Sequence, residues 1–234
     1  MNRSFLSLSI ALLIIGAIAA LDAPASAEML HLEFDTSATK ISASVMQPLS
    51  SLLFGDTATP VVGTFRVEEG EVDGDPANAS KTGHVHLLIN ATTYDSGLRH
   101  RDKNVLSSVL ETALNTSIVF DSTRLEDVSA DPSGNAGRAT VVGNLTLHGT
   151  TREIRVPVRL SISLEHQLYA DGEVTFTYTD WGVKRAKIAF LVPASDQVTV
   201  TFHVVANPPA TPGPGTPTPT PEPGLTPEPN PSPG

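Results

Sequence analysis

Basic side chains gather at two places in a chain that is acidic overall. The 234 residues include 15 lysines and arginines against 25 aspartates and glutamates, which gives a formal net charge of −10. The clustered basic side chains are Arg99, His100, Arg101 and Lys103 in "LRHRDK", and Lys184 and Arg185 in "DWGVKR", where Trp181 precedes them and could form part of a rim. Because arginine can donate two parallel hydrogen bonds to a phosphate or a carboxylate, these residues are candidates for binding an anionic group. The alternative is structural: Arg101 and Asp102 form an ion pair and cap a helix, while the lysines are solvated.

The remaining polar residues form no recognisable catalytic pattern. The chain has no Gly-x-Ser-x-Gly elbow, no phosphate-binding loop and no His-Glu-x-x-His helix, so we predict that it is not an enzyme. It has no cysteine, which excludes disulfides and thiol chemistry. His84 and His86 share one face of a predicted strand, but no third ligand is evident, so we predict no metal and no cofactor. His148 is expected in a turn, where it could pair with Glu153 across a hairpin.

Alternation of apolar and polar residues dominates the middle of the chain. Turn-rich stretches separate the alternating segments, so the pattern predicts about eight antiparallel strands. These strands must hide their apolar face in a two-sheet sandwich or in a closed barrel. Only 5% of the residues are aromatic, and Gly63 and Gly143 fall on inward faces, which permits a hollow interior. A filled core stays open as the alternative. The segments are 29–34, 61–72, 83–90, 116–128, 137–149, 152–165, 172–179 and 196–205.

The segment 144–160 predicts a hairpin with a definite register. We expect Leu147 to face Ile154 across the hairpin, so that the apolar side chains of both strands share one face. The bend would then fall at 150–151. Pro157 lacks a backbone N–H, so it should lie at an edge or at a bulge.

One segment has helical rather than strand periodicity. In 101–115, Val105, Val109 and Leu110 recur at the spacing of an amphipathic helix, and Asp102 can cap its N-terminus. We therefore predict an all-β fold, an antiparallel eight-stranded barrel with a short amphipathic helix over about 102–115 near one end.

The two ends of the chain are unlike the middle. Residues 1–27 read as a signal peptide, with Arg3, an apolar run and "ASA" before the expected cleavage site, so we predict an exported protein, periplasmic or extracellular. Residues 28–206 form the predicted domain. Residues 207–234 are rich in proline and threonine and are predicted to be a disordered tail. The negative charge disfavours nucleic acid as a partner, and no stable membrane span is expected after cleavage.

Several blocks of the sequence resemble the YceI-like family. The resemblance covers about 30–204, with 39–65 matching less closely and the proline-rich tail outside the family pattern. It implies an exported, lipocalin-like antiparallel barrel that binds polyisoprenoids or other long-chain amphiphiles. The blocks are "RHRDKNVL" (99–106), "IVFDSTRLE" (118–126), "GNLTLHGTTREIRVPV" (143–158), "DWGV" (180–183) and "ASDQVTVTF" (194–202).

The resemblance also implies a site, an apolar tunnel with a polar mouth for a head group. We expect the tunnel to be lined by Phe65, Val85, Leu87, Leu106, Val109, Leu110, Phe120, Leu145, Leu147, Val156 and Phe176. We expect the mouth to be formed by Arg99, His100, Arg101, Trp181, Lys184 and Arg185. The implied function is that of a secreted or periplasmic protein that sequesters or carries an isoprenoid, quinone-like or other long-chain lipid. The alternative is a surface- or stress-associated module whose barrel is filled and whose tail positions it. A homodimer stays open.

Overall fold

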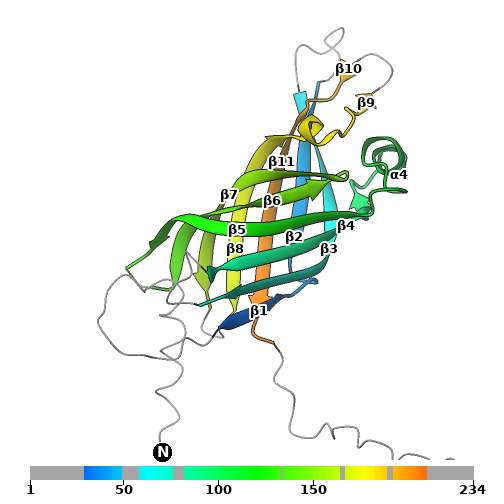
Figure 1. The fold of residues 1–234 in the computed structure, drawn as a ribbon. Coiled ribbons are helices and arrows are strands. Elements are labelled where there is room, and N and C mark those ends of the chain that lie inside the picture. Colours follow the sequence, from blue (N-terminus) through cyan, green and yellow to red (C-terminus); the bar gives the residue numbers. More distant parts are fainter. Residues whose placement is uncertain are drawn as a thin grey trace, which may run out of the picture.

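A computed structural model describes residues 29–48, 58–75, 82–132, 134–163, 167–188 and 192–209. The expected signal peptide and nearly all of the expected tail lie outside these residues. Most of the described residues form one antiparallel sheet that closes on itself, because its last strand, β11, pairs with both β2 and β8. Figure 1 shows helix α4 near one end of this barrel and strand β1 at the other. In the described segments, no helix is both long and apolar enough to cross a bilayer.

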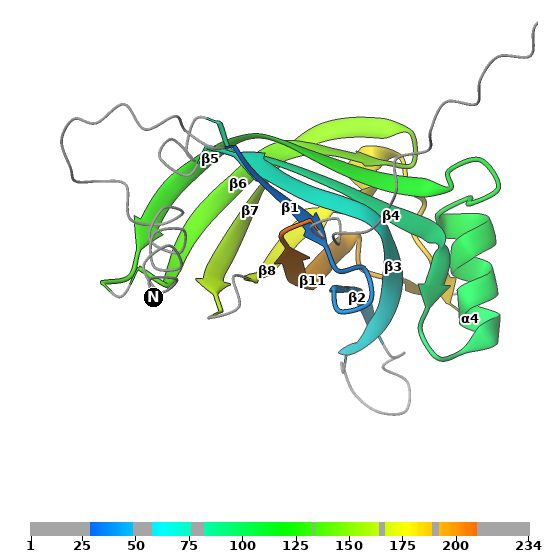
Figure 2. The same ribbon diagram turned by 90° about the horizontal axis from the view of Figure 1, so that it is seen from below.

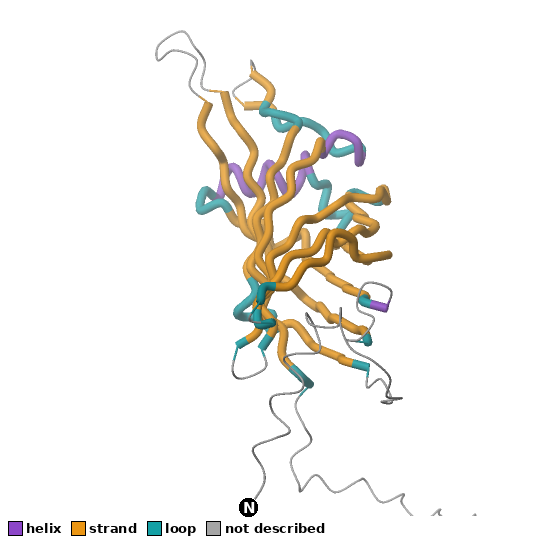
Figure 3. Tube along the Cα trace, turned by 90° about the vertical axis from the view of Figure 1, so that its left-hand side faces the viewer, coloured by secondary structure: helices purple, strands orange, loops and turns teal. Residues whose placement is uncertain are grey.

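The sheet contains nine strands in the order β1-β11-β2-β3-β4-β5-β6-β7-β8, and strands dominate the trace in Figure 3. A separate two-stranded ribbon, β9–β10, lies between β8 and β11 in the sequence. The bounds are β1 Leu30–Phe34, β2 Lys40–Pro48, β3 Ala58–Gly74, β4 His84–Asp95, β5 Ser117–Ala130, β6 Ala136–Leu147, β7 Thr150–Ile162, β8 Leu168–Thr177, β9 Lys187–Ile188, β10 Val192–Pro193 and β11 Gln197–Asn207.

β1 and β2 together occupy one position of the barrel, which is why nine strands make an eight-stranded wall. Both strands pair with β3 on one side and β11 on the other. A turn interrupts them, in which the Asp35 carboxylate accepts hydrogen bonds from the N–H groups of Ser37 and Ala38 at 2.9 and 3.0 Å. The Ser37 hydroxyl also donates to this carboxylate, at 2.6 Å, and this bond, together with the two backbone bonds, holds the pKa of Asp35 below its ordinary value. The prediction of an eight-stranded antiparallel barrel is confirmed, although β2 was not among the predicted strands.

The predicted hairpin exists, but its predicted register is wrong by four residues. Gly143, and not Leu147, lies opposite Ile154, and Leu147 lies opposite Thr150. The reason is the turn: His148 and Gly149 both have positive φ, 52° and 72°, as a two-residue type I′ turn requires. The expected bend residues, 150–151, therefore begin β7. Because the shift is an even number, the inward face is unchanged.

Pro157 lies where β7 loses one of its two neighbours. β7 pairs with β6 along its whole length, but its pairing with β8 begins only at Val158. The missing N–H of Pro157 thus coincides with the end of that ladder, as expected for a strand proline.

The predicted helix begins three residues earlier than expected and ends sooner. It comprises α4, Arg99–Asn104, followed by a π-helical turn, η2, Val105–Val109. The prediction that Asp102 caps it is wrong, because Asp102 lies inside the first turn, where its carboxylate accepts hydrogen bonds from the backbone and hydroxyl of Ser96. Leu114 falls beyond the helix and is 85% exposed.

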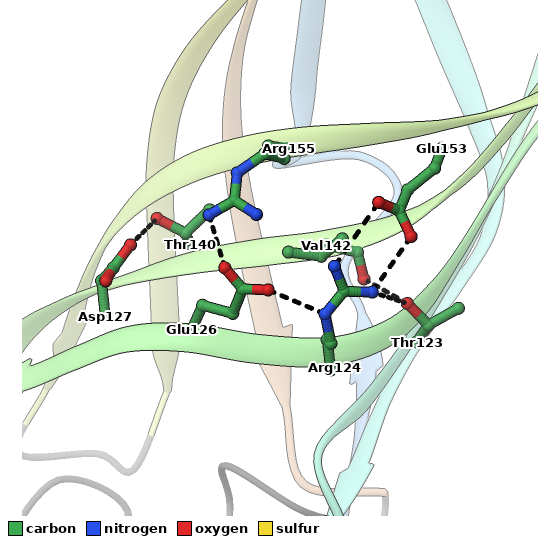
Figure 4. Close-up of polar contacts among 8 residues, drawn as sticks. All are labelled: Thr123, Arg124, Glu126, Asp127, Thr140, Val142, Glu153 and Arg155. Atoms are coloured by element: carbon green, nitrogen blue, oxygen red, sulfur yellow. Dashed lines mark hydrogen bonds and ion pairs between the residues drawn. The ribbon is translucent and has the colours of Figure 1, made fainter.

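An ion network crosses the outer wall over β5, β6 and β7 (Figure 4). Arg124 binds Glu126 at 2.7 Å and Glu153 at 3.0 Å, and Arg155 binds the other oxygen of Glu126. The pair of His148 with Glu153 that the sequence allowed is not formed, because His148 binds Glu111 instead. The network is solvent-exposed, so it fixes the relative position of the strands more than it stabilises them.

Aromatic rings on the inner wall lie against glycines. A Cβ on Gly63 would come within 2.1 Å of the ring of Tyr94, and one on Gly172 within 2.3 Å of the ring of Phe202. The same relation joins Gly70 to Phe34 and Gly143 to Phe120, at 2.2 and 2.6 Å. Each glycine thus leaves a recess that lets a ring lie flat on the sheet instead of projecting across the barrel.

We expect Gly63→Ala to lower the free energy of unfolding by about 1–3 kcal/mol, because the methyl group collides with the Tyr94 ring. The same substitution in a Tyr94→Ala background should cost much less. Denaturant unfolding of the two single variants and the double variant measures this coupling. Equal costs in both backgrounds would show that the ring contact does not make the glycine necessary.

Candidate ligand-binding cavity

The barrel encloses a cavity of about 980 Å³. Its walls come from the inward-facing side chains of the strands and from the inner side of the helical segment. They are almost entirely aliphatic or aromatic, with polar groups confined to the two ends. This volume lies at the upper end of the range for pockets that bury one small ligand. The interior is therefore hollow, and the alternative of a filled core does not hold.

The cavity wall includes every predicted tunnel residue except Leu106. These are Phe65, Val85, Leu87, Val109, Leu110, Phe120, Leu145, Leu147, Val156 and Phe176. Leu106 is half-buried on the helical segment, and its neighbour Val105 lies on the cavity instead. The wall also includes Ile41, Ala43 and Val45 of β2, which the sequence analysis missed, although these three residues alternate with polar ones as strand residues do.

The helix end of the cavity is its more basic end. His100 and Arg101 line it, as predicted, whereas Arg99 is exposed and is not part of the wall. Arg101 donates from Nε to the hydroxyl of Ser96 at 2.7 Å and from Nη2 to the Ser96 carbonyl at 3.0 Å. These bonds replace the expected ion pair with Asp102 and fix the guanidinium at the cavity. Tyr94 lies at the same end, and burial raises the pKa of its hydroxyl.

Trp181 is a structural plug, and not part of the mouth as predicted. Only 3% of its surface is exposed, and its indole N–H donates to the carbonyl of Leu145 at 2.9 Å. Its ring centroid lies 5.0 Å from that of Phe176, and Arg152 of β7 donates to the carbonyl of Asp180 at 2.7 Å. Trp181 thus joins β6 and β8 near the stretch where β7 has no ladder with β8.

The two predicted mouth residues that follow Trp181 lie in ion pairs. Lys184 binds Glu111 at 2.5 Å, and Arg185 binds Asp196 at 3.3 Å. Neither residue is part of the cavity wall, so the structure does not place them at the mouth as predicted.

Glu111 ties the helical segment to the barrel. Its carboxylate binds Lys184 and, at 2.9 Å, the Nε2 of His148 in the β6–β7 turn. Lys184 and His148 both lower the pKa of Glu111. Since Glu111 directly follows Leu110, which lines the cavity, this contact holds the helix over the cavity end.

The opposite end of the cavity has a different polar lining. Asp73, Asp75, Ser129 and Arg138 lie there, near the start of β1. The two ends therefore differ in charge, with a guanidinium and an imidazole at the helix end and two carboxylates beside one guanidinium at the other.

Comparisons with known proteins agree with this architecture. A UPF0312 protein of Pseudomonas aeruginosa (strain LESB58) is 27% identical over 148 residues, which are 61% of this chain and 71% of that protein. A UPF0312 protein of Vibrio campbellii is 30% identical over 97 residues, 41% of this chain and 48% of that protein.

Two solved structures have a similar fold. Burkholderia cenocepacia BcnA gives a TM-score of 0.59 at 23% identity, over 74% of this chain and 99% of that one. A structure described as a polyisoprenoid binding domain from Saccharophagus degradans gives 0.55 at 16% identity, over 78% and 100%. The model of the YceI-like domain matches residues 32–206. The chain therefore belongs to the YceI-like family.

Proposed function

We propose that this protein binds one long-chain lipid, an isoprenoid or a similar amphiphile, non-covalently inside the barrel. The observation that carries the proposal is the cavity of about 980 Å³ with an apolar wall and polar ends. Transfer of an apolar chain out of water into such a space is favourable by about 25 cal/mol per Å². The Saccharophagus degradans domain, described as polyisoprenoid-binding, has the same fold and supports this class of ligand.

The polar head of the ligand would lie at the helix end. Arg101 is the residue best placed to bind it, because its guanidinium lines the cavity and is already oriented by Ser96. An arginine held in this way loses little conformational entropy when it binds an anion. The chain of the ligand would then extend along Phe120 and Val156 toward the opposite end.

We propose further that the protein acts outside the cytoplasm as a carrier or a store of its ligand, and not as an enzyme. The sequence of residues 1–27 supports export, and the composition of 207–234 supports a spacer that follows the domain. A surface module with a filled barrel is not favoured, because the interior is hollow. Binding alone accounts for the residues that line the cavity.

A larger side chain inside the cavity should weaken lipid binding. Ala43→Phe adds an aromatic ring to the inner wall, and we expect it to weaken binding of a polyprenol by about tenfold or more. Ser44→Phe, one residue further along β2 and on the other face of the sheet, is the matched control. Native mass spectrometry detects the bound lipid. Equal binding by both variants would place the ligand outside the barrel.

Arg101 should determine the choice of head group. We expect the wild type to prefer a polyprenyl phosphate to the corresponding alcohol by about tenfold, and Arg101→Gln to lose this preference. Competition with a fluorescent lipid measures both affinities. A purely structural role for Arg101 would instead lower the affinity for the two lipids equally.

The Glu111 contact should control the rate at which ligand leaves. We expect Glu111→Gln to raise the dissociation rate of a bound fluorescent lipid several-fold, while Glu126→Gln on the outer wall leaves it unchanged. Because the folded-state pKa of Glu111 is lowered, the contact is complete above the ordinary glutamate pKa and is lost as the pH falls through the lower, folded-state pKa. Stopped-flow measurements at decreasing pH should therefore show faster release only in acid. Release that is independent of pH in this range would contradict this role.

A further inference from the structure

Imidazoles and carboxylates alternate across the outer wall near the end opposite α4. The register places His31 opposite Asp73 and Glu33 opposite Glu71 between β1 and β3. It continues with Glu71 opposite His86 and Asp73 opposite His84 between β3 and β4, and with His86 opposite Asp121 on β5. The sheet order places β3, β4 and β5 side by side, with β1 paired to β3, and Figure 2 shows these strands in one wall of the barrel. All of these residues except Asp73 lie outside the cavity, and Asp73 borders its end away from α4.

Three of these side chains have potential ligand atoms close enough together to bind one metal ion. One ligand atom from each of His31, Glu71 and Asp73 lies within 4.8 Å of the other two. His31 and Asp73 are already in contact, with 2.7 Å between Nδ1 and Oδ1. Glu33 adds a further carboxylate oxygen 3.8 Å from the Nε2 of His31. Within the described residues, this is the one group of three or more such side chains that meets these distances.

The charges around this group favour a cation. Glu33 and Glu71 are directly opposite across the β1–β3 ladder, an arrangement that destabilises a sheet unless a positive charge lies between the two carboxylates. An imidazole nitrogen combined with carboxylate oxygens is the ligand set of Zn²⁺ and similar first-row ions, whereas Ca²⁺ takes oxygen alone.

We propose that His31, Glu71 and Asp73 bind a divalent transition-metal ion, of which Zn²⁺ is the representative, on the outer wall of the barrel. The ion would join β1 to β3 directly, in addition to the backbone ladder that already connects them. His84 and His86, whose spacing in the sequence resembles a pair of metal ligands, lie beside this site, opposite Asp73 and Glu71. Their partners are different: the carbonyl of Ser122 for His84 and the carboxylate of Asp121 for His86.

Titration of Zn²⁺ into untagged, metal-free protein by calorimetry tests the proposal. We expect one equivalent to bind to the wild type, and His31→Ala and Glu71→Gln each to weaken binding by at least about tenfold. The matched control is His203→Ala. His203 forms the same kind of pair with Asp171, also at 2.7 Å, but belongs to no such group of three in the described chain. This variant should bind Zn²⁺ as the wild type does.

Two further measurements separate a specific site from an acidic patch. Zn²⁺ should perturb the NMR signals of the His31 ring before those of the other histidines, and Ca²⁺ at the same concentration should not displace it. If Ca²⁺ competes equally, or if His31→Ala leaves binding unchanged, the proposal fails. The substituted residues His31 and Glu71 do not line the cavity, so the polyprenol assay can be run on the same variants as a separate readout. Absence of Zn²⁺ binding by a wild-type protein that binds polyprenol would refute this proposal and leave the proposed lipid binding intact.

Discussion

The width of the cavity depends on where the aromatic rings of the inner wall lie. An eight-stranded barrel has just enough interior for its own side chains, so a hollow one must keep large groups away from its axis. This chain does so by placing Gly63, Gly70, Gly143 and Gly172 beside Tyr94, Phe34, Phe120 and Phe202. The remaining wall is mostly valine, leucine and isoleucine. The hollow interior therefore depends on these four glycines as well as on the apolar residues of the wall.

The ends of the barrel are built by a different principle. Near the helix end the strands part, since β4 pairs with β5 only through Asn90 and β7 pairs with β8 only from Val158. Each opening is covered from outside the sheet, the first by α4 and η2, the second by Trp181. These covering segments are not part of the sheet ladder, so side chains must hold them in place. Glu111 holds the helical segment, and Arg152 holds the segment that contains Trp181. Polar groups consequently gather where the sheet is incomplete, and they include the one guanidinium fixed at that end of the cavity by Ser96.

Much of this architecture could be predicted from the sequence, and the errors have identifiable causes. The alternation of apolar and polar residues predicted the barrel and the eight expected cavity residues that lie on strands, because burial of one face of a strand produces this alternation. Helical periodicity predicted Val109 and Leu110. The hairpin register could not be predicted from alternation alone, since any even shift preserves the pattern; the positive φ of His148 decided it. β2 was missed because its inward residues include the small Ala43. The role of Trp181 and the ion pairs of Lys184 and Arg185 depend on contacts between distant segments, which no local pattern records.

The pairing of Glu33 with Asn207 brings the first and last strands together at the pole of the barrel that lies away from α4. Any chain that continues beyond Asn207 departs from that pole. If such an extension were attached to a surface, the barrel end that carries α4 would point away from that surface. The end of the cavity that contains Arg101 would then be accessible to the surroundings. The strand that carries His31 would lie nearest to the point of attachment.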